Sequence, residues 1–195
     1  MLYTKKGDDG TTGIIRRDPP APDQSGGRAG QRISKSSNIA EALGSLDEIN
    51  SFLGLCKVKS REGGFKIGEK SFEAIVHSLQ ESLFMVQAEL AGADKHIGGE
   101  KVKEVESWID EAEKDMPPIK TFFISGGTEL GAKFDVARTI ARRAERRVVG
   151  VNAEGVVKLG AETLQFMNRL SSILYALARL SNHKSGIKES APSYN

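Results

Sequence analysis

The chain has 195 residues, of which 38% are hydrophobic and 28% are charged, and its formal net charge is +2. This length fits one domain better than two, and the composition is that of a soluble protein with a real core. The balanced charge disfavours a globally basic nucleic-acid binder, one cysteine excludes an internal disulfide, and three scattered histidines form no zinc-ligand pattern. No apolar run reaches the length of a membrane span, and residues 1–15 lack the apolar core of a secretory signal, so we expect a cytoplasmic protein.

Residues 1–35 are rich in glycine and proline and poor in apolar side chains. This composition favours a disordered arm, because it buries too little surface to offset the entropy of ordering. Its first part, TKKGDDGTTG at residues 4–13, permits a second interpretation. Alternating glycines let the backbone approach a ligand closely, and the lysines and hydroxyls suit a polyphosphate with Mg²⁺. The segment lacks the Gly-Lys-Ser/Thr end of a Walker A loop, so it is a weak signal by itself.

From Ser36 onward, hydrophobic residues recur with the 3.6-residue period of a helix. Five such stripes predict helices over residues 39–56, 72–90, 102–116, 134–151 and 167–177. Glycine or proline stands in each gap, and we place Gly150 and Gly155 in the last one. Residues 121–124 are the only β-like piece. The pattern predicts an all-α five-helix bundle over residues 36–184, between an N-terminal loop with a flexible linker at 1–35 and a polar tail at 185–195.

Two helical motifs carry polar side chains beside their apolar stripes. In LGSLDEIN, residues 43–50, Asp47 and Asn50 share a helical face, and a solvated polar surface is the favoured interpretation. In FMNRLSS, residues 166–172, Asn168 interrupts an apolar environment. We expect this asparagine to be buried, where it needs partners, so that it either specifies packing or contacts a ligand. Arg169 is expected at the surface.

The most informative motif is FFISGGTELGAKFDVARTIARRAERR, residues 122–147. Thr128 is the expected N-cap of its helix. Arg138, Arg142 and Glu145 are spaced four and three residues apart, which places them on one helical face. Arg142 and Glu145 can pair, which leaves Arg138 to find a partner elsewhere. The residues alone leave three interpretations open: a solvated arginine-rich helix, an RNA-binding helix, and a site for an anion.

In this order, the four motifs resemble those of the PduO-type ATP:cob(I)alamin adenosyltransferase family, and the match extends over residues 4–179. The resemblance implies a homotrimer of five-helix bundles with active sites between subunits. It implies transfer of the 5′-deoxyadenosyl group of ATP to the cobalt of cob(I)alamin or another reduced corrinoid, with Mg²⁺ on the phosphates and release of tripolyphosphate. It further implies an electron-donating reductase and an adenosylcobalamin-dependent acceptor enzyme as partners, and neither nucleic acid nor a membrane.

The resemblance also implies roles for single residues. Phe122 would help to exclude a lower cobalt ligand, and Asn168 would contact ATP. Asp47 would pair with Arg138 across the subunit interface. The rest of the ATP site would come from two groups: Arg138, Arg142 and Glu145 of the neighbouring subunit, and the phosphate-binding residues Thr4, Lys5, Gly7, Asp8, Gly10, Thr12 and Lys35.

Three features depart from the family pattern. Ser125 replaces a proline before the double glycine, which loosens the loop. On the corrin side, Ser172 replaces the aspartate after NRLS, and a serine can donate a hydrogen bond but cannot balance a cation. The linker over residues 13–34 is long and rich in proline and glycine, so its ordering costs binding energy. Ser172 motivates the alternative that the chain is a non-catalytic module that binds or delivers ATP or adenosylcobalamin on the same fold. A helical RNA-binding or scaffold protein is the third hypothesis.

Overall fold

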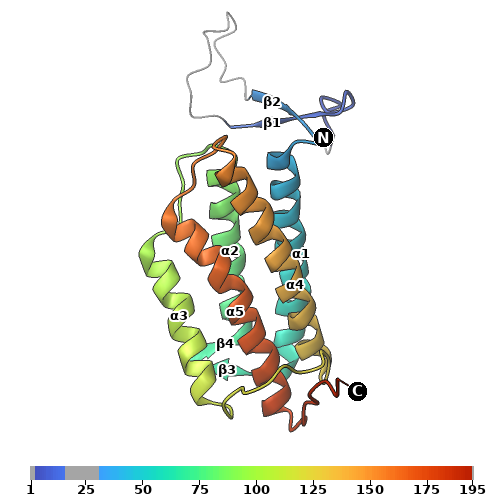
Figure 1. Ribbon diagram of the computed structural model, residues 1–195, viewed down its shortest axis with the longest axis vertical. Helices are drawn as coiled ribbons and strands as arrows, with labels where there is room; N and C mark the ends of the chain where they lie inside the picture. Colours follow the sequence, from blue (N-terminus) through green and yellow to red (C-terminus); the bar gives the residue numbers. More distant parts are fainter. Residues whose placement is uncertain (1–2, 16–30, 195) are drawn as a thin grey trace, which may run out of the picture.

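The computed structural model describes residues 3–15 and 31–194. Five helices dominate these residues, and each runs antiparallel to the one before it (Figure 1). They are α1 (Asn38–Gly63), α2 (Phe72–Leu90), α3 (Gly99–Lys114), α4 (Glu129–Ala153) and α5 (Ala161–Lys184). The all-α five-helix bundle predicted from the periodicity is therefore confirmed.

Helices α4 and α5 form the centre of the bundle, because they pack on each other while α4 also packs on α1 and α5 also packs on α3. Three fully buried phenylalanines join the helices: Phe72 of α2, Phe134 of α4 and Phe166 of α5. The rings of Phe72 and Phe134 meet edge to face, with their centroids 6.1 Å apart. Side chains on α4 and α5 are thus presented from rigid elements, as a precise binding site requires.

The helix ends follow local chemistry. Thr128 caps α4 as predicted, since its Oγ1 accepts a hydrogen bond of 2.9 Å from the backbone N–H three residues on. Gly64 ends α1 with φ 62°, a left-handed conformation that favours glycine. At the start of α5, Gly160 has no side chain to serve as a cap. Buried Glu89 of α2 takes that role, because it accepts hydrogen bonds from the Gly160 N–H at 2.8 Å and from Thr163 Oγ1 at 2.6 Å.

Two short antiparallel hairpins accompany the bundle. Strand β1 (Thr11–Ile14) pairs with β2 (Gln31–Ser34) just before α1, and β3 (Lys66–Ile67) pairs with β4 (Lys70–Ser71) between α1 and α2. Part of the segment expected as a disordered arm or linker therefore forms a hairpin, while residues 16–30 of that linker lie outside the described residues.

Three local expectations were wrong. Residues 121–124 form no strand, and the Ile124 N–H bonds instead to the carbonyl oxygen of Ser190 at 2.9 Å. Gly150 lies inside α4, because its neighbours Val148 and Val151 are buried and their packing outweighs the poor helix propensity of one glycine. Helix α3 ends at Lys114, two residues before the predicted end, because two prolines follow at residues 117–118.

Candidate functional site

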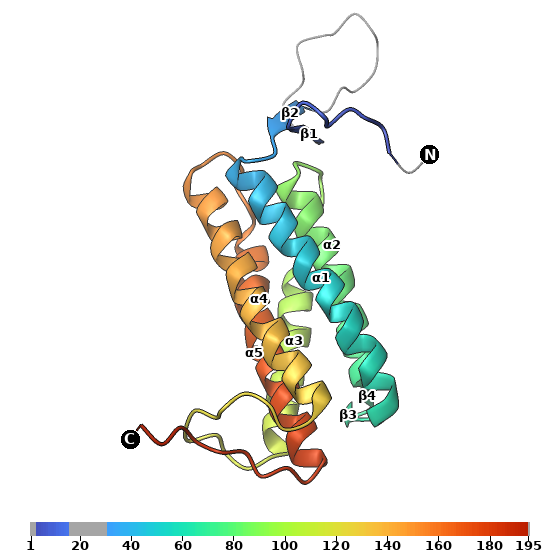
Figure 2. The same cartoon turned by 90° about the vertical axis from the view of Figure 1, so that its right-hand side faces the viewer.

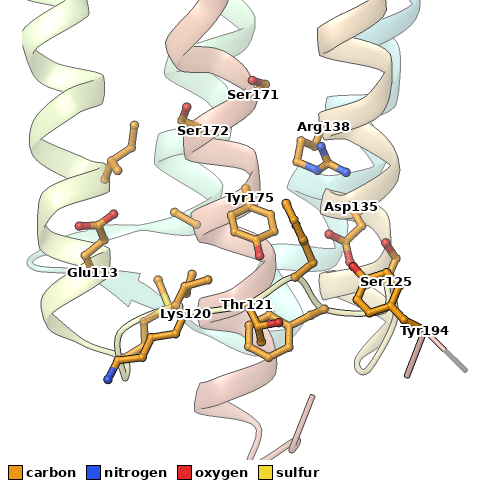
Figure 3. A pocket seen from close by; sticks show the side chains of 16 residues that line it. Glu113, Lys120, Thr121, Ser125, Asp135, Arg138, Ser171, Ser172, Tyr175 and Tyr194 are labelled. Atoms are coloured by element: carbon orange, nitrogen blue, oxygen red, sulfur yellow. The ribbon is translucent and has the colours of Figure 1, made fainter. Parts of the chain in front are cut away.

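A cavity of about 880 Å³ opens at the end of the bundle where α3 and α5 finish and α4 begins (Figure 3). Its walls come from α3, α4, α5, the α3–α4 loop (residues 115–128) and the C-terminal tail (residues 185–194). Aromatic and aliphatic side chains make up half of the lining, and polar or charged side chains make up the other half. Small-molecule sites combine these two kinds of group. The wall includes Met116, Phe122, Phe123, Ser125, Asp135, Arg138, Ser172, Tyr175 and Tyr194.

Two cations line this cavity, Lys120 of the α3–α4 loop and Arg138 of α4. Arg138 is the one on a helix. Its side chain is partly buried, and its Nε is fully buried with no hydrogen-bond partner among the described residues. Its guanidinium carbon lies 5.9 Å from the centroid of the Tyr175 ring. Burial raises the pKa of the Tyr175 hydroxyl, so this side chain stays neutral at physiological pH. Within its own chain, Arg138 therefore faces the ring of Tyr175 and forms no ion pair with a described carboxylate. Its positive charge is available to an anion in the cavity.

Phe122 and Ser172 both line this cavity. The Phe122 side chain is 76% exposed, so it is free to lie against a ligand. Ser172 is exposed on α5, in the upper part of the close-up view (Figure 3). Ser125 lies in the loop just before Gly126 and Gly127, whose φ values of 134° and 93° suit glycine best. The double glycine therefore sets the sharp return of the loop toward α4.

Glu145 of α4 and Asn168 of α5 lie close together, further from the α3–α4 loop than the cavity residues Arg138 and Ser172. Asn168 Nδ2 donates to Glu145 Oε1 at 3.0 Å. The predicted pair of Arg142 with Glu145 does not form. Arg142 is exposed and makes no ion pair with a described residue. Asn168 is exposed rather than buried, which corrects the expectation. The helix turns this position outward because its neighbours Met167 and Leu170 fill the core.

Arg169 is not a lone surface residue. Its Nη1 donates to Asn168 Oδ1 at 2.7 Å, and its Nε donates to Glu106 of α3 at 2.8 Å. Both polar ends of Asn168 are thus held by neighbours, one on Glu145 and the other on Arg169. Arg142, Glu145 and Asn168 share an outer surface of the bundle. On this surface, hydrogen bonds orient the side chains of Glu145 and Asn168.

Asp47 lies exposed on α1 and makes no hydrogen bond or ion pair with a described residue. Its neighbour Glu48 instead accepts from Arg143, which joins α1 to α4. Arg147 lies 3.6 Å from Glu41 on the same pair of helices. Within one chain, then, Asp47 and Arg138 do not meet, and their pairing across an interface stays a prediction.

The N-terminal loop (residues 4–13) is shaped by hydrogen bonds across and within the hairpin. Lys35 Nζ donates to the carbonyl oxygen of Gly7 at 2.8 Å, and its backbone N–H donates to that of Gly10 at 2.9 Å. Lys5 has φ 59° and Gly10 has φ 79°, so two left-handed residues bend the loop. The side chains of Thr4, Lys5 and Asp8 are exposed, and that of Thr12 is half-buried on β1. The structure thus brings Lys35 to the predicted phosphate-binding residues.

Asp9 and Arg32 also shape this loop, and the sequence interpretation missed both. Asp9 Oδ1 accepts from the Thr11 backbone N–H at 2.9 Å and from its hydroxyl at 2.7 Å. These bonds, with the nearby Arg32 guanidinium, lower the pKa of the Asp9 carboxyl. Arg32 donates to the Lys6 carbonyl oxygen and to Thr11 Oγ1, across the hairpin. The Asp-x-Thr spacing was a readable signal for the first contact, whereas nothing local indicated Arg32.

The N-terminal loop and the α3–α4 loop, which lines the cavity, lie at opposite ends of the bundle (Figures 1 and 2). The hairpin sits beyond the start of α1, whereas the cavity lies where α4 starts and α5 ends. One copy of the chain therefore does not bring Lys5 or Lys35 to Arg138 or Phe122.

No three histidine, cysteine, aspartate or glutamate side chains gather as metal ligands would in residues 3–15 and 31–194. Across the same residues, no helix has both the length and the apolar character needed to cross a membrane.

The fold and this site define an all-α protein with one glycine-rich loop that carries lysines and a separate aromatic cavity that contains an arginine. The family model for cobalamin adenosyltransferase matches residues 2–181. The chain belongs to the cobalamin adenosyltransferase family.

Individual relatives agree with this assignment. The corrinoid adenosyltransferase PduO of Citrobacter freundii is 33% identical over 93% of this chain, and the chain spans about half, 50%, of that relative's length. The corrinoid adenosyltransferase of Bacillus subtilis is 35% identical over 95% of this chain and 89% of its own length. Among solved structures, a variant of the PduO-type ATP:corrinoid adenosyltransferase from Lactobacillus reuteri complexed with cobalamin and ATP is similar, with a TM-score of 0.81, 29% identity and 99% of both chains covered.

Proposed function

We propose that this chain transfers the 5′-deoxyadenosyl group of ATP to the cobalt of a reduced corrinoid such as cob(I)alamin. A bond forms between cobalt and C5′ while the bond from C5′ to the phosphate oxygen breaks, and its electron pair leaves with tripolyphosphate. Because Co(I) supplies the nucleophile, the protein needs no serine, cysteine or histidine nucleophile. Its own task is to align two substrates and to stabilise the charge that develops on the leaving group.

The observation that carries this proposal is the position of Arg138 in the cavity wall. An arginine whose Nε is buried and without a partner in its own chain is costly unless an anion completes its surroundings. The aromatic wall around it, formed by Phe122, Phe123 and Tyr175, suits a large flat ring. The cavity therefore fits the meeting point of a corrin with the charged end of a nucleotide.

A complete site needs a second copy of the chain, since the N-terminal loop and the cavity lie far apart in one copy. In the proposed homotrimer, Lys5 and Lys35 of one subunit face Arg138 and Arg142 of the next, around the triphosphate. Asp47, which is exposed and unpaired among the described residues, would then supply the carboxylate that Arg138 lacks.

The remaining components are proposed on chemical grounds. Mg²⁺ would be held mainly by the ATP phosphates, because this ion takes oxygen ligands and is usually bound through substrate phosphates with few protein groups. Cob(I)alamin is strongly reducing, so a reductase must supply it and the reducing cytoplasm suits the reaction. The product adenosylcobalamin would pass to an acceptor enzyme that uses it.

The direct test mixes the purified protein with Mg-ATP and chemically reduced cob(I)alamin under anaerobic conditions, and follows the corrin absorbance. We expect the light-sensitive spectrum of adenosylcobalamin. In the variant Arg142→Ala the turnover should fall about a hundredfold, because a cation that stabilises the leaving group is lost. Size-exclusion chromatography should show the same trimer in both proteins. A trimer of this variant that retains full turnover would refute the role given to Arg142.

The second candidate, a non-catalytic module that binds or delivers ATP or adenosylcobalamin, is favoured by one residue. Ser172 lines the cavity and cannot balance a cation there. Binding of ATP without product in the same assay would support this candidate, and the variant Ser172→Asp should then gain turnover.

A further inference from the structure

Arg179, near the end of α5, is a charged residue inside the core, with only 2% of its surface exposed. Its Nη2 donates to Asp135 Oδ2 of α4 at 2.5 Å, and its Nη1 donates to Glu189 Oε1 of the C-terminal tail. Its guanidinium carbon lies 5.0 Å from the centroid of the Tyr175 ring and 5.9 Å from that of Phe123. One buried arginine thus contacts α4, the C-terminal tail, the α3–α4 loop and the cavity wall.

Asn182, one turn further along α5, is completely buried and binds the same loop and tail. Its Oδ1 accepts from the backbone N–H and the hydroxyl of Thr128, each at 2.9 Å. Its Nδ2 donates to the Gly126 carbonyl oxygen at 2.8 Å and to Glu189 Oε1 at 2.6 Å. A Cβ at Gly127 would lie 2.7 Å from the Asn182 side chain, so the close approach of the loop requires glycine.

The tail also binds the loop directly. The Ile124 N–H donates to the carbonyl oxygen of Ser190 at 2.9 Å, and Figure 2 shows the tail running along the loop below the bundle. Tyr194 of the tail lines the cavity together with Phe122 and Phe123 of the loop. Glu189, whose side chain is only 13% exposed, is the point where the tail meets both buried residues of α5.

We propose that Arg179 and Glu189 are positioning residues for the corrin side of the site. They hold the α3–α4 loop against α5, and the loop in turn holds Phe122 at the cavity. The tail, for which the sequence offered no role, is then a structural part of the cavity wall. This inference rests on the proposed function, because it names the groups that shape the corrin-binding part of that same site.

The physical reason lies in burial. A hydrogen bond between buried charged groups is strong, and an arginine left with one carboxylate fewer is a costly buried charge. Without Glu189 the guanidinium loses one of its two anions and Asn182 loses one acceptor. The loop keeps its bonds to Asn182 through Thr128 and Gly126, so we expect it to loosen rather than to unfold.

The test uses the full chain with the single change Glu189→Ala. The corrinoid KM should rise about tenfold, because the change removes a bond to the charged group of Arg179 beside the cavity. The ATP KM should change less than about twofold, because the N-terminal loop is not touched. The variant Glu189→Gln keeps an oxygen acceptor for Arg179 and Asn182, and should lie closer to the unchanged protein. Lys188→Ala, at an exposed neighbouring position, is the matched control and should behave as the unchanged chain.

A second readout does not depend on activity. Lys120 is exposed in the α3–α4 loop, so trypsin cleavage after this residue, identified by mass spectrometry, reports how tightly the loop is held. Cleavage there should be about tenfold faster in Glu189→Ala than in Lys188→Ala. Unchanged cleavage together with an unchanged corrinoid KM would overturn the inference. If no protein in the series makes adenosylcobalamin, the proposed function fails, and the cleavage rates alone decide whether Glu189 positions the loop.

Discussion

The two halves of the site are built in opposite ways. The N-terminal loop is held by exposed contacts, such as those that Arg32 and Lys35 make to carbonyl and hydroxyl oxygens. The cavity end is held by buried ones, with Arg179 and Asp135 only 2% and 4% exposed. Exposed pairs contribute little net stability, whereas a buried pair is expensive to break. If the proposed function holds, the loop is therefore suited to change shape around ATP, and the cavity end is suited to keep its shape before the corrinoid binds.

The largest effect should follow from breaking the buried pair. Asp135→Ala leaves Arg179 with Glu189 alone and also removes the acceptor that faces the Gly126 N–H. We expect the free energy of unfolding to fall by about 3–5 kcal/mol, because an uncompensated charge is left in the core. Urea unfolding followed by circular dichroism measures the change.

The control for this variant is Asp110→Ala, which removes an exposed aspartate of α3. Its free energy of unfolding should stay within about 0.5 kcal/mol of the unchanged protein. Equal losses in the two variants would mean that the Asp135–Arg179 pair gives the cavity end no special rigidity, and the contrast between the two halves would fail.

The next effect concerns the reaction itself. Arg138→Ala removes the partly buried cation of the cavity wall and leaves only the exposed Lys120, so kcat/KM for adenosylation should fall by about two to three orders of magnitude. Arg146→Ala, on the exposed side of the same helix, is the matched control and should keep its activity. Thermal unfolding of both variants separates a lost catalytic contact from a lost fold. A similar kcat/KM for the two variants would show that Arg138 serves packing rather than the leaving group.

A smaller effect is expected at the other end of the bundle. Arg32→Ala removes the donor that ties Lys6 and Thr11 together across the hairpin. The loop would then have to be ordered by ATP, and the ATP KM should rise about fivefold. The corrinoid KM should stay the same, because Arg32 makes these bonds within the hairpin and does not line the cavity. A rise in both KM values would mean that the loop of one subunit also shapes the corrinoid site in the cavity of its neighbour.

The sequence predicted the parts of the fold that depend on local order. The five apolar stripes fixed the helices, and Thr128 was recognised as a cap because its role needs only the next three residues. The sequence did not reveal the roles of Arg179 and Asn182, because their partners Asp135 and Thr128 lie far away in the chain. An arginine inside the apolar run of α5 was the one available signal. Asn168 was misplaced for a related reason: an apolar neighbourhood in sequence does not say which face of a helix turns outward.

The smallest effect tests whether the N-terminal loop is set by its own hydrogen bonds. Those from Thr11 lower the pKa of Asp9 from its ordinary value of 3.8, so this contribution to loop order is complete above pH 3.8 and is lost as the pH falls through the lower pKa of the folded protein. Thr11→Val should raise the Asp9 pKa toward its ordinary value, whereas Thr12→Val should leave it unchanged, as NMR titration of the carboxyl carbons would show. An Asp9 pKa that ignores Thr11 would mean that the loop is shaped by something other than this turn. With the turn intact, the Asp9 carboxylate keeps its charge throughout the neutral range. Any dependence of ATP affinity on pH near neutrality must then arise from the phosphates or from groups outside this turn.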